Sequence, residues 1–178
     1  LFEKIWYGVP ARRDALRREA LMVIFVRVDD RLLHGQIICT WVPHIKADAL
    51  VIASDEAARD TLVTDIISSC GHKGLTVCVK SLKDAVAHVS TCECGEMAIL
   101  IVGDLKDAMT VYEEGFRFET LNLGNIHHEE GGREVTPSII INPDDEEIIR
   151  RFESLGVRID IRDVPASAPT RHGERKSP

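Results

Sequence analysis

One short stretch of the chain brings together side chains that are suited to chemistry. Residues 26–36 read Val-Arg-Val-Asp-Asp-Arg-Leu-Leu-His-Gly-Gln, so two guanidinium groups, two carboxylates and one imidazole lie close together in the sequence. A neutral imidazole is a nucleophile near pH 7, and guanidinium groups match the oxygens of a phosphate. His34 is therefore a candidate acceptor of a phosphoryl group, with Arg27 and Arg31 as the residues that offset its charge.

Two other interpretations of His34 stay open. One is a solvated loop histidine without a function, and the other is a metal ligand. A metal site has less support, because His34, His44 and His72 fall in different predicted elements and no Cys/His set has the spacing of a zinc finger. Gly35 favours phosphoryl chemistry, since a glycine allows the backbone to approach a ligand closely. No metal and no other cofactor is expected.

The flanking sequence places this stretch between a strand and a helix. Residues 22–28 form an apolar run rich in β-branched side chains, which predicts a buried strand. Residues 35–46 then follow a helical spacing, with apolar side chains at Ile37, Ile38, Trp41 and Ile45. In parallel α/β sheets, ligands bind where strand ends meet the following helices, and a helix N-terminus offers N–H groups to an anion. A phosphoryl group fits this position.

Strand and helix signals alternate along the rest of the chain. Further strands are predicted at 49–53, 75–79, 97–102, 120–123 and 157–161, and helices at 57–70, from 81 onward, 104–114 and 144–154. Residues 133–141 are predicted to be an extended edge segment that contains Pro137. In the helix at 57–70, Leu62, Ile66 and Ile67 are expected to face the core. The alternation predicts an α/β fold, with a three-layer α/β/α arrangement around a mainly parallel sheet.

Composition and the chain ends limit the remaining possibilities. The chain has 178 residues and a net charge of −7 without a basic tract, so nucleic-acid binding is not expected. No apolar run is long enough to span a bilayer, and no signal peptide is recognisable, so a cytoplasmic protein is expected. One domain is expected at 22–165, with residues 1–21 as an extension outside the fold and residues 166–178 as a disordered tail.

Four blocks of the sequence, taken in order, resemble a known family. They are residues 27–36, Thr40-Trp41, residues 52–58 (Ile-Ala-Ser-Asp-Glu-Ala-Ala) and residues 121–127 (Leu-Asn-Leu-Gly-Asn-Ile-His). From Met22 to Asp163 the chain resembles the IIB component of the mannose/fructose/sorbose class of bacterial phosphotransferase systems. The last block is most similar to the N-acetylgalactosamine branch of that class.

This resemblance implies a function and a set of partners. His34 would accept a phosphoryl group from a histidine of a IIA protein and pass it to a sugar, either an amino sugar or a hexose, that is imported by a IIC/IID membrane pair. The implied enzyme is a protein-N(pi)-phosphohistidine–sugar phosphotransferase that IIC/IID recruit to the inner face of the membrane. A regulatory phosphohistidine protein of the same fold, which signals without transport, stays open as the alternative. The oligomeric state is also open, with a homo-oligomer as one option.

Other residues at predicted strand ends are candidates for the phosphate pocket. Asp29 and Asp30 are expected to hold the arginines in place or to orient the imidazole. Asp55 ends the second strand and is expected either to bond the His34 loop or to cap the next helix. The remaining pocket candidates are Gly35, Gln36, Gly124 and Asn125. A metal-dependent hydrolase, the third functional class, has little support, because carboxylates and histidines fall at no recognisable ligand spacing.

The cysteines provide a further alternative. Five cysteines in a chain without a secretion signal predict free thiols rather than a disulfide framework. Some phosphotransferase IIB proteins carry the phosphoryl group on cysteine, so Cys39 is an alternative acceptor, although its place in a helical pattern favours a packing role. Cys92 and Cys94 are interpreted as part of a loop.

Overall fold

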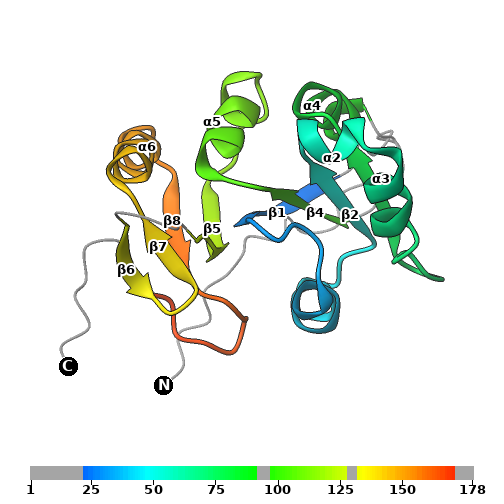
Figure 1. Cartoon of the computed structure of the whole chain (residues 1–178), viewed down its shortest axis with the longest axis horizontal. Coiled ribbons are helices and arrows are strands. Elements are labelled where there is room, and N and C mark those ends of the chain that lie inside the picture. The colour runs from blue at the N-terminus through cyan, green and yellow to red at the C-terminus, as the bar shows by residue number, and fades with distance from the viewer. Residues whose placement is uncertain (1–21, 92–96, 128–131, 171–178) are drawn as a thin grey trace, which may run out of the picture.

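The computed structural model describes residues 22–91, 97–127 and 132–170 (Figure 1). In this part of the chain, six strands form one sheet in the order β3-β2-β4-β1-β5-β8, and every neighbouring pair is parallel. The strands are β1 (Met22–Asp29), β2 (Ala49–Ala53), β3 (Thr76–Lys80), β4 (Met97–Val102), β5 (Thr120–Asn125) and β8 (Arg158–Ile161). The predicted α/β class with a central parallel sheet is confirmed.

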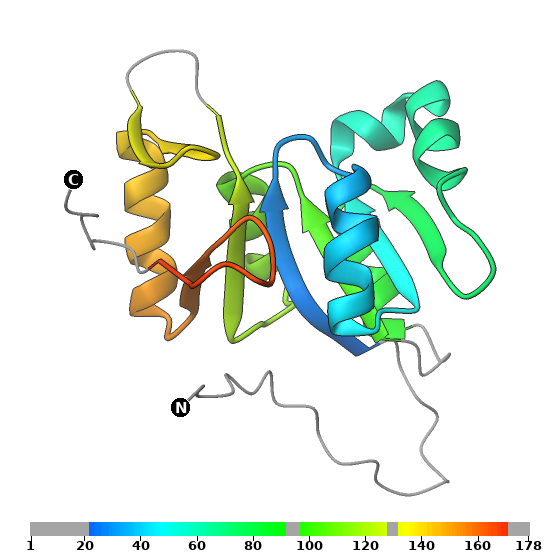
Figure 2. The same ribbon diagram turned by 90° about the horizontal axis from the view of Figure 1, so that it is seen from below.

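Helices flank the sheet, which explains why its central strands are apolar along almost their whole length. One layer contains α4 (Leu82–Thr91), α5 (Leu105–Glu113) and α6 (Pro143–Ser154), whose apolar side chains share one core with one face of the sheet. On the opposite face, a second core contains Ile37, Trp41 and Ile45. Figure 2 shows the short helix that carries these residues lying across that face of the sheet.

That short helix is not the single α-helix predicted at 35–46. It consists of a π-helical segment, η1 (Ile37–Trp41), followed by one turn of α-helix, α1 (Val42–Ile45). The Thr40 hydroxyl donates a hydrogen bond to the Gln36 carbonyl at 2.6 Å within the widened turn. Single π-turns are common next to functional sites, and this one follows directly after the candidate loop.

The segment predicted as one helix at 57–70 is two short helices, α2 (Asp55–Arg59) and α3 (Thr61–Ser68). Asp60 separates them, because its backbone is extended and its carboxylate accepts hydrogen bonds from the N–H groups of Leu62 and Val63 at 2.9 and 3.1 Å. The expectation that Leu62 and Ile66 face the core is wrong, since their exposed fractions are 67% and 58%. Of the three expected core residues in this segment, Ile67 alone packs, partly buried, against the core.

Residues 133–141 form an antiparallel hairpin outside the main sheet, built from β6 (Arg133–Thr136) and β7 (Ile139–Ile141). Pro137 lies in the turn of this hairpin, where strand pairing does not need a backbone N–H. The hairpin is attached to the end of β5, because the Ile126 N–H donates to the Ser138 carbonyl at 2.9 Å and the Ile140 N–H donates to the Ile126 carbonyl at 2.7 Å. It therefore lies beside the carboxyl edge of the sheet.

The described part of the chain continues past the expected domain boundary at residue 165. The Thr170 N–H donates a hydrogen bond to the Ile161 carbonyl at 3.0 Å, next to strand β8. The first part of the predicted disordered tail is therefore structured, whereas residues 1–21, residues 171–178 and the Cys92/Cys94 pair lie outside the described residues. In the described ranges, no helix is long and apolar enough to cross a membrane.

Candidate functional site

The loop that carries His34 follows β1 at the carboxyl edge of the sheet (Figure 2). It begins with a tight turn, in which the Leu32 N–H donates to the Asp29 carbonyl at 2.9 Å and Leu32 has a left-handed backbone with a φ of 53°. Such a left-handed conformation is uncommon for a leucine, and residues that adopt it are often found at functional sites. The turn folds the loop back, so that His34 returns to the end of the strand it follows.

Two contacts define the state of the His34 imidazole. Nε2 lies 2.9 Å from Oδ2 of Asp29, and Nδ1 contacts Nη2 of Arg31. A carboxylate only accepts hydrogen bonds and a guanidinium only donates them, so Nε2 carries the proton and Nδ1 presents its lone pair. In this arrangement Nδ1 is the nucleophilic atom of the ring, and Arg31 covers it. The His34 side chain is only 13% exposed.

Asp29 connects this ring to a buried cation. Its Oδ2 atom also accepts hydrogen bonds from Nε and Nη2 of Arg27, at 3.1 and 2.9 Å, and both side chains are fully buried. Burial lowers the pKa of Arg27, while the neighbouring Asp29 charge opposes this effect. Two charge-assisted hydrogen bonds to Asp29 favour the protonated guanidinium, so the two residues form a buried ion pair. Arg27 thus lies beneath the loop and contacts His34 only through Asp29.

Strands β5 and β8 surround the other side of the Arg27 guanidinium. Its Nη1 atom donates to Oδ1 of Asn122 at 2.6 Å and to the Arg162 carbonyl at 3.3 Å. The ring of Trp41 lies 5.4 Å from its central carbon, and Gly124 lies directly against it. The site therefore extends below the loop into the sheet.

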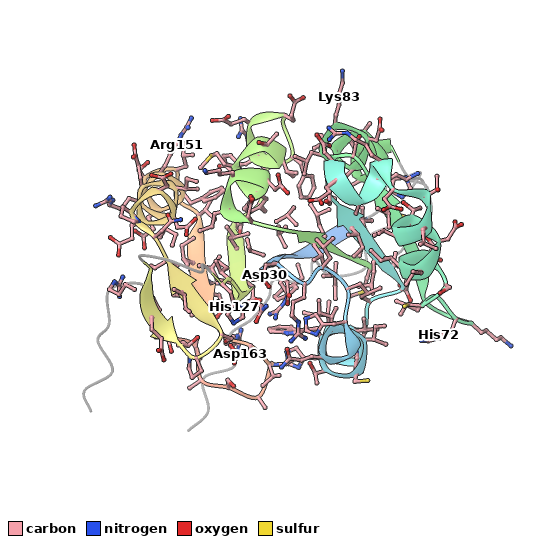
Figure 3. The ribbon with its side chains drawn as sticks, in the orientation of Figure 1. Asp30, His72, Lys83, His127, Arg151 and Asp163 are labelled. Atoms are coloured by element: carbon pink, nitrogen blue, oxygen red, sulfur yellow. The ribbon has the colours of Figure 1, made fainter. Side chains whose placement is uncertain are left out.

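Asp30 ties the loop to the end of β5 (Figure 3). One of its oxygens accepts from the Asn125 side chain, and the other accepts from the N–H of His127 at 2.9 Å and contacts Nδ1 of that histidine at 3.1 Å. The Asp30 N–H donates to the Asn125 carbonyl at 3.0 Å. Asn125 thus helps to hold the loop in place. His127, interpreted from the sequence as an exposed turn residue, is half exposed and bonded to Asp30 of the loop.

Asp55 lies in a different group of side chains. Its Oδ1 atom accepts from the Leu82 N–H at 2.9 Å, at the start of α4, and Ser54 rather than Asp55 caps α2. Asp55 and Asp104 also act on Asp107, whose pKa is raised to about 6, first by burial and then by these two charges. Asp55 therefore supports the start of α4. Within the described residues, it makes no contact with His34.

Gly35 and Gln36 follow His34 in the first helical turn, where the His34 carbonyl accepts from the Ile37 N–H at 3.0 Å. A Cβ atom built on Gly35 would meet nothing within 4 Å outside its chain neighbours, so packing does not require a glycine at this position. For the described residues, no group of three or more His, Cys, Asp or Glu side chains is arranged to hold a metal ion.

Asn122 was not predicted as a site residue, although the sequence contains a signal for it. Asn122 interrupts an apolar strand in the same way as Arg27 does, and two buried polar residues on separate strands are expected to find each other. The two are paired neighbours in the β1–β5 register. Only the strand order, which puts β5 next to β1, makes the pairing evident.

Comparisons with known proteins identify the family of this chain. The family model described as "PTS system sorbose subfamily IIB component" matches residues 23–173. The fructose-specific EIIB component of Bacillus subtilis is 30% identical over 150 residues, which are 82% of this chain and 90% of that protein. The chain is thus a phosphocarrier protein, a sugar phosphotransferase. It belongs to the sorbose subfamily of PTS IIB components.

Solved structures support the same conclusion. The IIBSor domain of the sorbose permease from Klebsiella pneumoniae superposes with a TM-score of 0.78 at 27% identity, covering 85% of this chain and 93% of that one. The N-acetylgalactosamine-specific IIB component 1 from Escherichia coli gives a TM-score of 0.80 at 23% identity, covering 85% and 99% of the two chains. At 23% identity, this last similarity establishes a shared fold.

Proposed function

We propose that His34 is the phosphorylated residue and that Nδ1 is the atom that accepts the phosphoryl group. The observation that carries this proposal is the hydrogen bond from His34 Nε2 to Asp29, which leaves the lone pair on Nδ1. In the transfer, the bond between phosphorus and the donor's histidine nitrogen breaks while a bond between phosphorus and Nδ1 forms. Positive charge develops on the His34 ring during this step, and the Asp29 carboxylate stabilises it.

Arg31 has to move for this reaction. Its guanidinium contacts Nδ1 in the unphosphorylated protein, at the position the phosphorus would occupy, and the residue is exposed. Displaced by the incoming group, Arg31 then donates to the phosphoryl oxygens and offsets their charge. The buried Arg27 acts indirectly, because its ion pair with Asp29 keeps that carboxylate charged and in place beside His34.

A conservative change of Arg31 tests this role. Arg31→Lys keeps the charge but removes the planar fork, so phosphoryl transfer from a phosphorylated IIA protein should slow by roughly tenfold to a thousandfold. Rapid-quench measurement of transfer gives the rate. Arg59→Lys, an exposed arginine on α2, is the matched control and should transfer at the wild-type rate. Unchanged kinetics in a folded Arg31→Lys protein would make Arg31 a structural residue.

The partners follow from family membership, because a IIB component works between a IIA phosphodonor and a IIC/IID membrane pair. We infer that both dock around the loop, where Leu32, Leu33 and Ile38 are partly exposed apolar side chains. Contact between two carriers has to be brief, so a small interface with weak binding is expected. Arg31 adds a local positive charge in a chain of net charge −7, which makes the attraction to a phosphorylated donor sensitive to salt.

The proposed final acceptor is an amino sugar, N-acetylgalactosamine. The block Gly124-Asn125-Ile126-His127 supports this choice, since it resembles that branch of the family. The test is to mix the phosphorylated chain with membranes that contain IIC and IID of either an N-acetylgalactosamine or a fructose system. Phosphorylation of the amino sugar is expected to be faster. Faster phosphorylation of fructose would contradict the sugar assignment, and no transfer in any system would favour the regulatory alternative.

A further inference from the structure

Gly124 is in contact with the Arg27 guanidinium in a way that no other residue type allows. A Cβ atom built on Gly124 would lie 1.7 Å from Cζ of Arg27, and 1.9 and 2.0 Å from its two Nη atoms. These distances are far below any real contact, so even an alanine would exclude the guanidinium from its present position. The backbone of Gly124 does not require a glycine, because its φ is not positive. The glycine is needed for the space it leaves.

Asn122 fixes the same guanidinium from the side. It is completely buried, its Oδ1 atom accepts from Arg27, and its Nδ2 atom donates to the carbonyls of Asp160 and Arg162 at 3.0 and 3.3 Å. The amide is therefore held by β8 and cannot turn away. Gly124 lies against the flat face of the Arg27 guanidinium, and Asn122 bonds its edge. Two residues of strand β5 therefore determine where the guanidinium lies.

We propose that Asn122 and Gly124 are positioning residues for phosphoryl transfer, and that they act through Arg27 and Asp29 on His34. Arg27 donates two hydrogen bonds to Oδ2 of Asp29. The same oxygen accepts a hydrogen bond from Nε2 of His34. One carboxylate oxygen thus serves both the buried cation and the ring. If the guanidinium shifts, Asp29 loses its counter-charge and moves, and the imidazole loses the partner that holds the proton on Nε2 and leaves the lone pair on Nδ1.

This inference rests on the proposed role of His34 and deepens it. Precise placement matters because an error of about 1 Å in the position of a reacting group is enough to slow a reaction about a hundredfold. A residue that only stabilises the sheet would have a different effect, since its loss would change the stability of the fold but not the tautomer of His34.

The test is a double-mutant cycle with Gly124→Ala and Arg27→Gln. Glutamine lacks the Cζ and Nη atoms with which the added methyl group would collide. Gly124→Ala should therefore slow transfer from phosphorylated IIA by about a hundredfold in the wild-type background and by less than about threefold in the Arg27→Gln background. Gly103→Ala is the matched control, because a Cβ there meets its nearest atom at 3.6 Å, and it should transfer at the wild-type rate.

The second measurement is the ¹⁵N spectrum of the His34 ring in unphosphorylated protein, which reports the tautomer without any transfer reaction. The Nε2–H form is expected in the wild type and a mixture of forms in Gly124→Ala. Equal slowing in both backgrounds, or an unchanged His34 spectrum, would overturn the proposal. If wild-type His34 accepts no phosphate, the proposed function fails while the spectrum still tests the positioning. If Gly124→Ala does not fold, Asn122→Ala takes its place with the same expected outcomes.

Discussion

Replacement of His34 by alanine is expected to abolish phosphorylation of this chain. In the wild type, incubation with labelled phosphoenolpyruvate, enzyme I, HPr and a matching IIA protein should label the chain stoichiometrically. The bond formed is a phosphoramidate, so the label should be lost in acid and survive in base. In His34→Ala the nucleophilic Nδ1 atom is gone, and no label above background should appear. This is the largest effect expected from any single change to the site.

Two neighbouring side chains provide the controls. Cys39 and His44 are both exposed on the short helix that follows the loop, and each is a possible acceptor by chemistry alone. Cys39→Ser and His44→Ala should both be labelled like the wild type. Stoichiometric label in His34→Ala, or a label that survives acid, would contradict the assignment and direct attention to Cys39. Both controls also show whether a substitution in this region disturbs the fold, since they lie within ten residues of His34.

Much of the sheet could be predicted because its signals are local. Strands β2 and β4 lie where their apolar runs predict them, since a buried parallel strand has a continuous apolar sequence. The sequence also put Arg31 on the same loop as His34, three residues away, and the structure brings the two side chains into contact. Arg27 and Asp29 pair on one face of β1, because side chains of residues i and i+2 in a strand point to the same side.

Features that depend on neighbours in space could not be predicted in this way. The role of Arg27 depends on Asn122 and Gly124, and these become its neighbours only through a strand order that places β5 beside β1. Helical spacing alone assigned Leu62 to the core, because it took no account of the break that Asp60 introduces by capping α3.

Asp29 is expected to give the largest loss of stability of any residue in the site. Asp29→Ala would leave the Arg27 guanidinium fully buried without its counter-charge, and breaking a buried pair in this way costs about 3–5 kcal/mol. Chemical denaturation should therefore show a free energy of unfolding reduced by that amount. Asp30→Ala is the matched control, because Asp30 is a partly exposed neighbour that pairs with a histidine, and it should cost less. Equal stability of Asp29→Ala and the wild type would contradict the ion pair.

A double variant separates the stability of the site from its chemistry. Arg27→Met with Asp29→Leu replaces both charges by apolar side chains of similar size, and such replacements of buried pairs are often neutral or stabilising. The double variant should regain most of the stability lost in Asp29→Ala. It should still transfer the phosphoryl group at least about a hundredfold more slowly than the wild type, because no carboxylate accepts the hydrogen bond from Nε2 of His34. Wild-type transfer rates in this stable variant would show that Asp29 supports the fold and has no effect on the imidazole.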